Sequence, residues 1–266
     1  MRLLCLNGWG GKLHAELLAY LRAEAPDVLC LQEVVHTPSS PKDWLTYRDG
    51  DHILPQRARF FDDVCAALPD HVAVFCPAAQ GVLWDGETQI PSQWGLASFV
   101  HKDLPIIAQM QGFVHGVCGD DGYGAHPRSR SGHAVRVWDY AAGRGVTFAH
   151  MHGLRDLAGK MDTPARAAQS RKFAGLVQHA MTPNDALVLC GDFNVGPYSE
   201  TLDILRGLAP RELVTEGGFD GTRSAHYPKP GKFADYMLVN DQVDIAHFSV
   251  VRAPEVSDHC PLVLEF

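Results

Sequence analysis

The amino-acid sequence predicts an α/β or α+β fold in which helices cover two β-sheets. Short apolar runs typical of buried strands alternate with segments of helical periodicity, and the middle of the chain is rich in strand patterns. The length of 266 residues, with 46% hydrophobic and 20% charged residues, allows a large hydrophobic core. Fully apolar strands and strands with other β-type patterns occur together with helices. Two sheets packed under helices are therefore the expected architecture.

The first third of the chain predicts three strands and two helices. Residues 2–8 are an apolar run that ends in a glycine-rich turn, and leucines recur at helical spacing over 12–24. Residues 36–57 contain Pro and Ser and are predicted to be a loop. The expected elements are strands at 2–8, 27–35 and 71–78 and helices at 12–24 and 57–68.

The rest of the chain predicts a strand-rich middle, a long helix and further strands. Thr163 is expected to be the N-cap of a helix over 164–181, with Pro164 at its first position. The run "ALVLCGDFN" (186–194) predicts a buried strand that ends in polar residues. The other expected elements are strands at 95–103, 106–116, 132–140, 145–153, 233–240, 245–251 and 261–265 and a short helix near 199–207.

The charge of the chain argues against an extended nucleic-acid-binding surface. The net charge is −8 and the sequence pI is about 5.9, whereas a dedicated duplex-binding protein usually carries a basic face. A basic patch around one phosphate stays compatible with this balance. No apolar stretch reaches the roughly 18–20 residues of a membrane span, and the N-terminal run is too short for a secretory signal. We therefore expect a cytoplasmic monomer with no membrane span.

The cysteines predict buried free thiols. The chain has 7 Cys, and no C-x-x-C pair occurs among them. Cys5, Cys30 and Cys190 lie in apolar strand-like runs, where a thiol behaves as a small core residue. Free thiols are consistent with a reducing compartment.

Polar side chains recur where predicted strands end or begin. They are Asn7, Glu33, His150, His152, Asp192, Asn194, Asp235, Asp258 and His259. Singly, most of them are also explained as turn or surface residues, as in "GDFNVGP" (191–197), because Gly, Asp, Asn and Pro are common in turns. Glu33 is different, since a carboxylate directly after a buried strand is costly unless it is paired or bound to a metal ion.

Together these residue types have the chemistry that metal-assisted hydrolysis of phosphate esters requires. Carboxylate and amide oxygens are ligands suited to Mg²⁺ or Mn²⁺. The cation neutralises a phosphoryl oxygen and the charge that develops on the leaving group. A carboxylate can orient or deprotonate a water, and a charged histidine held by an aspartate can hydrogen-bond a phosphate oxygen.

The same residues resemble those of the endonuclease/exonuclease/phosphatase superfamily, which includes DNase I-like nucleases. The matching segments, in order, are "LCLNGWGG", "DVLCLQEV", "FAHMHG", "LVLCGDFN", "FADYMLV" and "SDHCPLVLEF". The resemblance implies a DNase I-like, four-layer sandwich of two packed mixed sheets flanked by helices, in a single domain over residues 1–266. It also implies a hydrolase of phosphate esters, and we expect a phosphodiesterase.

The resemblance implies a metal site for Mg²⁺ or Mn²⁺. By the match to the family motifs, Asn7 and Glu33 would be ligands of the cation. Asp258 would either help at the metal or orient the imidazole of His259.

The resemblance also implies a catalytic group. Asp192 would position and deprotonate the attacking water, and Asn194 would bind an oxygen of the scissile phosphate. His259 would hydrogen-bond the phosphate in the transition state. Asp235 matches a family aspartate that orients a histidine or approaches the metal.

Two histidines compete for one family position. One alignment of "AHMHG" with the family motif favours His150 and another favours His152. The two are two residues apart on one predicted strand, so both side chains can lie on the same face. We expect both at the site, with His152 nearer the strand end.

Two basic stretches are candidates for substrate binding. In "HPRSRSGHAVR" (126–136), Arg128 and Arg130 could clamp a phosphate, because a guanidinium offers a bidentate fork. A second stretch, 222–233, contains Arg223, Lys229 and Lys232. A solvated loop is the alternative interpretation of the first stretch.

Three hypotheses about function follow. The first is a metal-dependent phosphodiesterase that acts on a small molecule, a lipid headgroup or a short nucleic acid. The second is a DNA or RNA nuclease of the same fold. The third is a phosphate-binding protein without catalysis, which predicts loss of residues such as Glu33, Asp192 or His259, and all three are present.

Overall fold

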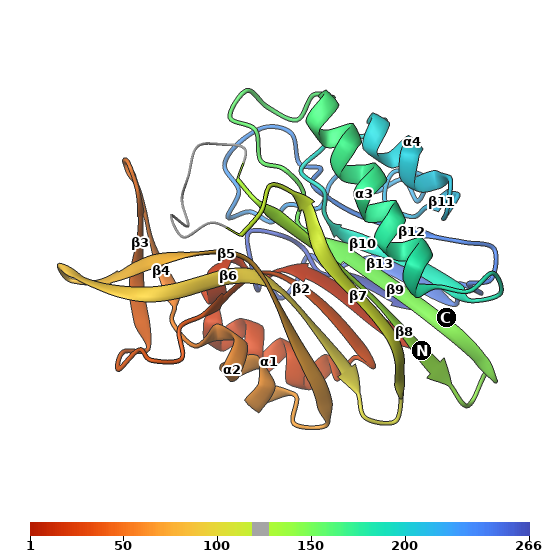
Figure 1. Ribbon diagram of the computed structural model, residues 1–266, viewed down its shortest axis with the longest axis horizontal. Helices are drawn as coiled ribbons and strands as arrows, with labels where there is room; N and C mark the ends of the chain where they lie inside the picture. The colour runs from red at the N-terminus through yellow and green to blue at the C-terminus, as the bar shows by residue number, and fades with distance from the viewer. Residues whose placement is uncertain (119–127) are drawn as a thin grey trace.

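Two mixed β-sheets packed face to face form the centre of the molecule (Figure 1). The structure is a computed structural model and describes residues 1–118 and 128–266. Within these residues the larger sheet has eight strands, in the order β13, β14, β1, β2, β6, β5, β3 and β4. Their bounds are β13 His247–Val250, β14 Leu262–Glu265, β1 Arg2–Asn7, β2 Val28–His36, β6 Thr88–His101, β5 His71–Asp85, β3 Trp44–Asp49 and β4 His52–Arg57.

The smaller sheet has six strands among the described residues, in the order β11, β12, β10, β9, β8 and β7. Their bounds are β11 Arg211–Glu212, β12 Asp235–Val239, β10 Ala186–Asp192, β9 Arg144–Met151, β8 Arg130–Asp139 and β7 Ile106–His115. Both sheets are mixed, because β1 and β2 are parallel, as are β9 and β10, while the other pairs are antiparallel.

Helices cover the outer face of each sheet. In Figure 1, α1 (His14–Glu24) and α2 (Phe60–Ala67) lie beside the larger sheet, and α3 (Pro164–Ala180) and α4 (Glu200–Arg206) lie beside the smaller one. A 3₁₀ turn, η1 (Trp9–Gly11), follows β1. The Thr163 side chain accepts a hydrogen bond from the Arg166 amide at 3.2 Å, so the predicted N-cap of α3 is confirmed. The four layers expected from the sequence are present.

Strand alternation divides the core into two clusters. In β1, Leu3 and Cys5 join the buried cluster that includes the smaller sheet, whereas Leu4 and Leu6 pack in the cluster beneath α1 and α2. Five of the seven cysteines are buried, and all seven are free, as predicted. The thiol of Cys190 contacts those of Cys5 and Cys30 across the two sheets.

The prediction of a loop over 36–57 was wrong in its second half. Residues 44–57 form the β3–β4 hairpin, in which Asp49 pairs with His52 across a two-residue turn. Gly50 has φ +57°, the left-handed conformation that such turns require. The alternation in "WLTYRD" and the "DGD" turn carry the hairpin signal, which the preceding Pro and Ser residues obscured. The strands β5 and β6 are longer than expected, and β11 was not predicted.

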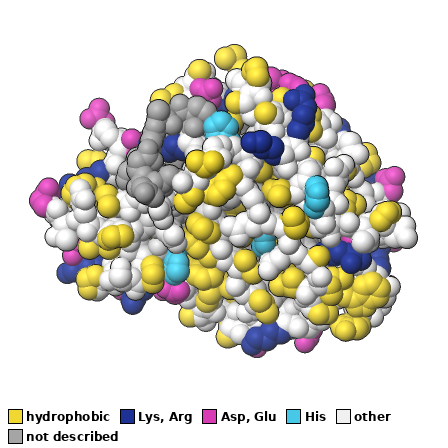
Figure 2. Space-filling view, viewed as in Figure 1, with side chains coloured by type: hydrophobic (Ala, Val, Ile, Leu, Met, Phe, Trp, Pro, Cys, Tyr) yellow, Lys and Arg dark blue, Asp and Glu magenta, His cyan; other side chains and the backbone are white. Residues whose placement is uncertain are grey.

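No helix among the described residues is long and apolar enough to cross a membrane. On the face shown in Figure 2, Lys and Arg side chains lie in separate small groups. This face carries no continuous basic stripe in its described residues, in agreement with the net negative charge.

Candidate active site

The topology of the two sheets brings the polar strand ends to one edge of the sandwich. β1 and β2 run parallel, β9 and β10 run parallel, and β10 packs on both β1 and β2. Asn7 and Asp192 are the last residues of β1 and β10, His152 directly follows β9, and all three lie at the same edge. Glu33 joins them from inside β2, which continues past it to His36, so Glu33 does not directly follow a buried strand as the sequence indicated. β12 is antiparallel to β10, and its first residue, Asp235, pairs directly with Asp192.

Asp192 lies at the centre of this group and is 1% exposed. Its Oδ1 accepts a hydrogen bond from the Asn194 amide at 3.0 Å, and its Oδ2 accepts one from Asn7 Nδ2 at 3.1 Å. Burial opposes ionisation, but the surrounding positive groups, led by His259, outweigh burial and hold the pKa of Asp192 well below its usual range. The carboxylate is therefore ionised at neutral pH.

Three nitrogens face Asp192 Oδ2 without reaching hydrogen-bond distance. His259 Nε2 lies at 3.6 Å, His152 Nε2 at 3.7 Å and Arg223 Nη2 at 3.9 Å. Polar groups at such separations commonly share a bridging oxygen atom. The arrangement leaves donors available for a water or a phosphate oxygen beside the carboxylate.

Glu33 reaches the site through a β-bulge. The register between β2 and β6 shifts between Leu31 and Val34, and Glu33 has φ +53°, which non-glycine residues rarely adopt. Glu33 Oε1 lies 3.9 Å from His152 Nε2. Burial raises the pKa of Glu33, but His152 and a hydrogen bond from Asn7 outweigh it, and the net pKa is lowered. Backbone strain of this kind persists where surrounding structure enforces it, often at functional sites.

Asp235 and His259 form a buried pair. His259 Nδ1 lies 2.8 Å from Asp235 Oδ2, and Thr222 Oγ1 donates to the same carboxylate oxygen at 2.7 Å. Burial lowers the pKa of His259, but Asp235 outweighs it, so the net pKa lies above the ordinary value of 6.5. The pair holds the ring with Nε2 turned toward Asp192.

Asp258 lies beside His259 and is paired with an arginine. Arg223 Nη1 donates to Asp258 Oδ2 at 2.8 Å, and Asp258 Oδ1 lies 3.8 Å from His259 Nε2. The neighbouring Ser257 hydroxyl donates to the carbonyl of Asn7 at 2.7 Å and ties this segment to the end of β1. Burial raises the pKa of Asp258.

The structure separates the two candidate histidines. Both side chains lie on the inner face of the smaller sheet, but only His152 contacts Glu33 and Asp192. His150 is fully buried one step deeper, with Nδ1 at 3.1 Å from Gln32 Nε2 and Nε2 at 2.9 Å from Ser98 Oγ. The expectation that both histidines face the site is therefore not met for His150, because the sheet edge lies beyond it.

The two histidines are nevertheless alike in charge. Burial, and next the adjacent Arg130, lower the pKa of His152 to about 4. Burial also lowers the pKa of His150. The pKa of both rings is therefore lowered, whereas that of His259 is raised.

The structure also separates the two candidate arginines. Arg130 Nε donates to the Gly153 carbonyl at 3.0 Å, and its charge acts on Glu33 and Asp192. Arg128 instead donates to Tyr47 Oη at 2.7 Å and to Asp49 at 2.8 Å, on β3. Arg128 is therefore held by the β3–β4 hairpin rather than by the carboxylate group. Residues 126 and 127 of the predicted basic stretch lie outside the described residues.

Two further basic residues belong to the neighbourhood. Lys160 Nζ donates to the Phe233 carbonyl and acts electrostatically on Asp192. The sequence indicated Arg223 only as one of three basic residues in 222–233, and it did not indicate Lys160. A single lysine in a loop gives no sequence pattern from which its place could be predicted.

The oxygen donors fit a hard divalent cation in part. The carboxylate of Glu33 is ionised and partly exposed, and that of Asp258 lies nearby. The Asn7 amide directs its nitrogen to Asp192 and Glu33 and its oxygen to the Trp9 amide at 3.0 Å, so rotation of the amide group is needed to direct the oxygen to a cation.

A second grouping of ligand atoms is present among the described residues. Asp192, Asp235 and His259 offer ligand atoms within 4.8 Å of one another. The closest of these contacts is the hydrogen bond between Asp235 and His259, so their proximity already has a structural cause. Glu33 and Asp258, as carboxylates without such a mutual bond, suit Mg²⁺ or Mn²⁺ better.

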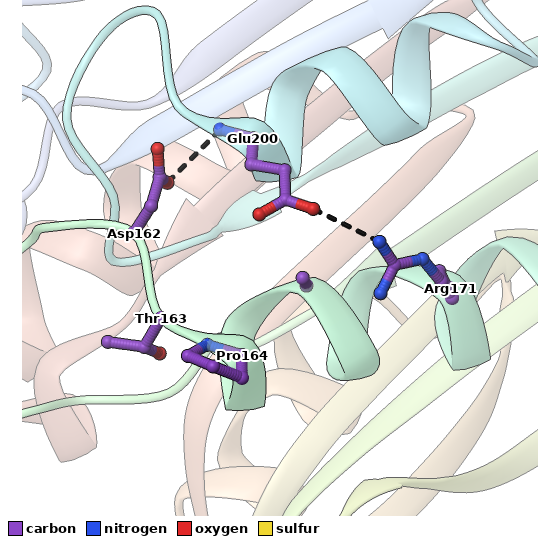
Figure 3. Close-up of a pocket in the computed structure, with 6 residues that line it drawn as sticks. Asp162, Thr163, Pro164, Arg171 and Glu200 are labelled. Atoms are coloured by element: carbon purple, nitrogen blue, oxygen red, sulfur yellow. Dashed lines mark hydrogen bonds and ion pairs between the residues drawn. The ribbon is translucent and has the colours of Figure 1, made fainter.

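A separate pocket lies at the N-terminus of α3 (Figure 3). It has a volume of about 360 Å³ and is lined by Asp162, Thr163, Pro164, Ala167, Arg171 and Glu200. Its charged groups are paired with one another, since Arg171 Nη2 donates to Glu200 at 3.0 Å and Asp162 accepts from the Glu200 amide at 3.1 Å. None of the polar strand-end residues lines it.

The fold is shared with solved structures of low sequence identity. Mannosyl-6-phosphatase of Bacteroides thetaiotaomicron has a TM-score of 0.66 at 14% identity and covers 100% of this chain and 98% of its own. The catalytic domain of human nocturnin has a TM-score of 0.64 at 17% identity, and the match covers 99% of this chain and 93% of the nocturnin chain. A humanised TDP2 of D. rerio has a TM-score of 0.62 at 12% identity, and the match covers 99% of this chain and 97% of the TDP2 chain. At these identities the likeness shows the fold alone.

The sequence itself gives the family. No curated protein matches the chain significantly. The profile of the Endonuclease/Exonuclease/phosphatase family, however, matches residues 5–259, a span that contains every residue of the strand-end group. On this match, and with the four-layer fold in agreement, the protein belongs to the endonuclease/exonuclease/phosphatase family.

Proposed function

We propose that this protein is a divalent-metal-dependent hydrolase of phosphate esters, with phosphodiesters as its main substrates. The observation that carries the proposal is the surroundings of Asp192. An ionised carboxylate faces three nitrogens at 3.6–3.9 Å, which leaves their donors available to the oxygens of a phosphate.

Glu33 and Asp258 would hold the cation, Mg²⁺ or Mn²⁺, with Asn7 as a third ligand after rotation of its amide. When bound, such a cation neutralises charge on a phosphoryl oxygen and on the leaving group. The bulge at Glu33 supports this role, because it turns a carboxylate inside the buried strand β2 toward the site.

Asp192 would orient the attacking water. The water oxygen would form a bond to phosphorus and release one proton, while the bond from phosphorus to the leaving oxygen breaks and that oxygen takes up one proton, so no proton is gained or lost overall. The lowered pKa of Asp192 keeps it ionised and makes it a weak proton acceptor, so orientation is its main contribution.

His259 and Asn194 would stabilise the phosphoryl group. The imidazole of His259, whose pKa is raised and whose ring is fixed by Asp235, would donate from Nε2 to a non-bridging oxygen. Asn194 Nδ2 donates to the Gly153 carbonyl at a long 3.3 Å and has a second hydrogen for a phosphate oxygen. His152, as a neutral ring beside Arg130, would contact the phosphate from the other side.

The substrate we favour is a small or lipid phosphoester or a short nucleic acid. The net charge of −8 and the scattered basic side chains support this choice over a long duplex. A DNA or RNA nuclease is the second candidate, and solved structures of similar fold include a mannosyl-6-phosphatase and TDP2. The free thiols support action in a reducing compartment, the cytoplasm.

A substrate panel in Mg²⁺ tests the proposal. It contains an activated phosphodiester, a phosphomonoester, intact and abasic DNA, RNA and a choline phospholipid. We expect cleavage of at least one ester, its loss in chelator and its return with Mg²⁺ or Mn²⁺. His259→Ala should abolish turnover, whereas His179→Ala, on the exposed face of α3, should not.

Two results would contradict the proposal. Undiminished cleavage in chelator would exclude the metal dependence. Full activity of His259→Ala would exclude the assigned site, and phosphate binding without any cleavage would favour a non-catalytic binding protein.

A further inference from the structure

The backbone of residues 222–224 pairs with the segment that carries Asp258 and His259. Arg223 forms an antiparallel bridge with His259, the Ser224 amide donates to the Asp258 carbonyl at 3.0 Å, and the Cys260 amide donates to the Thr222 carbonyl at 2.8 Å. The backbone of Arg223 is therefore fixed against the segment that carries the site histidine.

The side chain of Arg223 is 8% exposed, and its guanidinium has few acceptors. Nη1 donates to Asp258 Oδ2 at 2.8 Å, while Nη2 lies 3.9 Å from Asp192 Oδ2, beyond hydrogen-bond distance. Nε is buried and has no hydrogen-bond partner among the described residues. The ring of Tyr227 lies 4.5 Å from the guanidinium carbon.

This arrangement fits an arginine prepared for an anion. A guanidinium has five N–H donors, and a buried arginine ordinarily satisfies most of them. Asp258 and Tyr227 fix the plane of the group, so the unused Nη2 donors point at the carboxylate where the phosphate would bind. Lys229 and Lys232, from the same stretch, are exposed and lack this arrangement.

We propose that Arg223 binds the scissile phosphate, with Nη2 donating to a non-bridging oxygen beside Asp192. This inference rests on the proposed phosphoester hydrolysis and extends it with a residue that none of the strand-end motifs contains. A purely structural arginine would act only through Asp258 and would leave phosphate affinity unchanged apart from any change in metal affinity.

Phosphate binding measures this contact without turnover. Inorganic phosphate is titrated by calorimetry into the Mg²⁺-loaded wild-type, Arg223→Gln and Arg223→Lys proteins. We expect Arg223→Gln to weaken phosphate binding about 10–100-fold, the size of a hydrogen bond to a charged group. Arg223→Lys keeps the charge but loses the fork of N–H donors, so its phosphate affinity should lie between those of wild type and Arg223→Gln.

Two controls separate the contact from a structural effect. Arg136→Gln removes an arginine that pairs with a buried carboxylate far from the site, Asp185, and should leave phosphate affinity unchanged. Mn²⁺ affinity of Arg223→Gln is measured in the absence of phosphate, because Arg223 pairs with Asp258, a proposed ligand of the cation. The loss of phosphate affinity should persist at a cation concentration that saturates each variant.

The outcomes separate this inference from the function on which it rests. Wild-type phosphate affinity in Arg223→Gln, or a loss that only follows a loss of Mn²⁺ affinity, overturns the inference and leaves the hydrolysis standing. If Arg223→Gln does not fold, a phosphate affinity of Arg223→Lys equal to that of wild type overturns the proposed contact between the guanidinium and the phosphate. A wild-type protein that binds no phosphate and cleaves no ester overturns both proposals.

Discussion

Two buried aspartates flank the strand β10 at its opposite ends, and their surroundings differ. Asp185 precedes the strand and Asp192 ends it, and each is 1% exposed. Asp185 accepts five hydrogen bonds, from Arg136 at 2.7 and 3.0 Å, from Thr147 at 2.9 Å and from Thr182 at 2.9 and 2.8 Å. Every acceptor position of this carboxylate is occupied by the protein.

Asp192 accepts only two hydrogen bonds from the described residues, and its three nearest basic groups stay at 3.6–3.9 Å. Both carboxylates have a lowered pKa despite burial: Asp185 chiefly through the hydrogen bonds of Arg136, and Asp192 chiefly through the charge of His259. Under the proposed function, hydrogen-bond saturation distinguishes the structural carboxylate of Asp185 from that of Asp192, whose remaining acceptor capacity would be open to substrate.

The largest expected effect is the loss of activity in Asp192→Asn. Removal of the charge that orients the water should lower kcat about 10²–10⁴-fold while the fold stays intact. Steady-state kinetics on the preferred ester, together with a circular dichroism spectrum, measures both. Activity near that of wild type would show that the open carboxylate is not functional.

The matched variant Asp185→Asn should lower the stability of the protein and leave its activity unchanged. It leaves the partly buried guanidinium of Arg136 without its charged partner and should lower the free energy of unfolding by about 2–3 kcal/mol. Urea denaturation measures this loss. Activity at a temperature where the variant is folded should stay near that of wild type, and a selective loss of kcat would erase the distinction between the two aspartates.

Two glutamates extend the comparison to the metal. Glu33→Gln should raise the Mg²⁺ concentration that gives half-maximal activity by about 10–100-fold, because a charged ligand is lost. Glu212 is buried and accepts from the amides of Val214 at 2.7 Å and Thr215 at 2.8 Å, so Glu212→Gln should reduce stability without changing the Mg²⁺ requirement. Equal Mg²⁺ requirements in the two variants would count against Glu33 as a ligand.

The smallest expected effect is the pH dependence of the stability that Asp185 contributes. Its folded-state pKa lies below the ordinary value of 3.8, so its contribution to stability is fully present above about pH 4 and is lost as the pH falls through the folded-state value. The difference in unfolding free energy between wild type and Asp185→Asn should therefore shrink from pH 5 toward pH 2. A constant difference over this range would mean that the charge of Asp185 contributes nothing.

Much of the site could be predicted from the sequence, because a polar residue directly after a buried strand is a local pattern. The pattern located Asn7 and Asp192, and it also located Glu33, although β2 continues past Glu33 to His36. The parallel strand pairs of the fold bring the three residues together. Strand alternation placed His150 and His152 on one face but could not give their depth, since the position of the sheet edge depends on tertiary packing.

Other features depend on contacts between distant segments. Asp185 in "PNDALVL" and Asp192 in "LVLCGDF" look alike in sequence, and only the packing of Arg136 and Thr147 against the first separates them. Arg223 owes its place to pairing with a segment some 35 residues away, and no local pattern encodes that.

Hydrolysis in ¹⁸O-labelled water tests most directly the claim that the open face of Asp192 delivers water to phosphorus. The preferred ester is cleaved in Mg²⁺, and mass spectrometry locates the label in the products. The account predicts one ¹⁸O atom in the phosphate product per turnover and none in the alcohol. Label in the alcohol, or no cleavage of any ester by the wild-type protein, would contradict it.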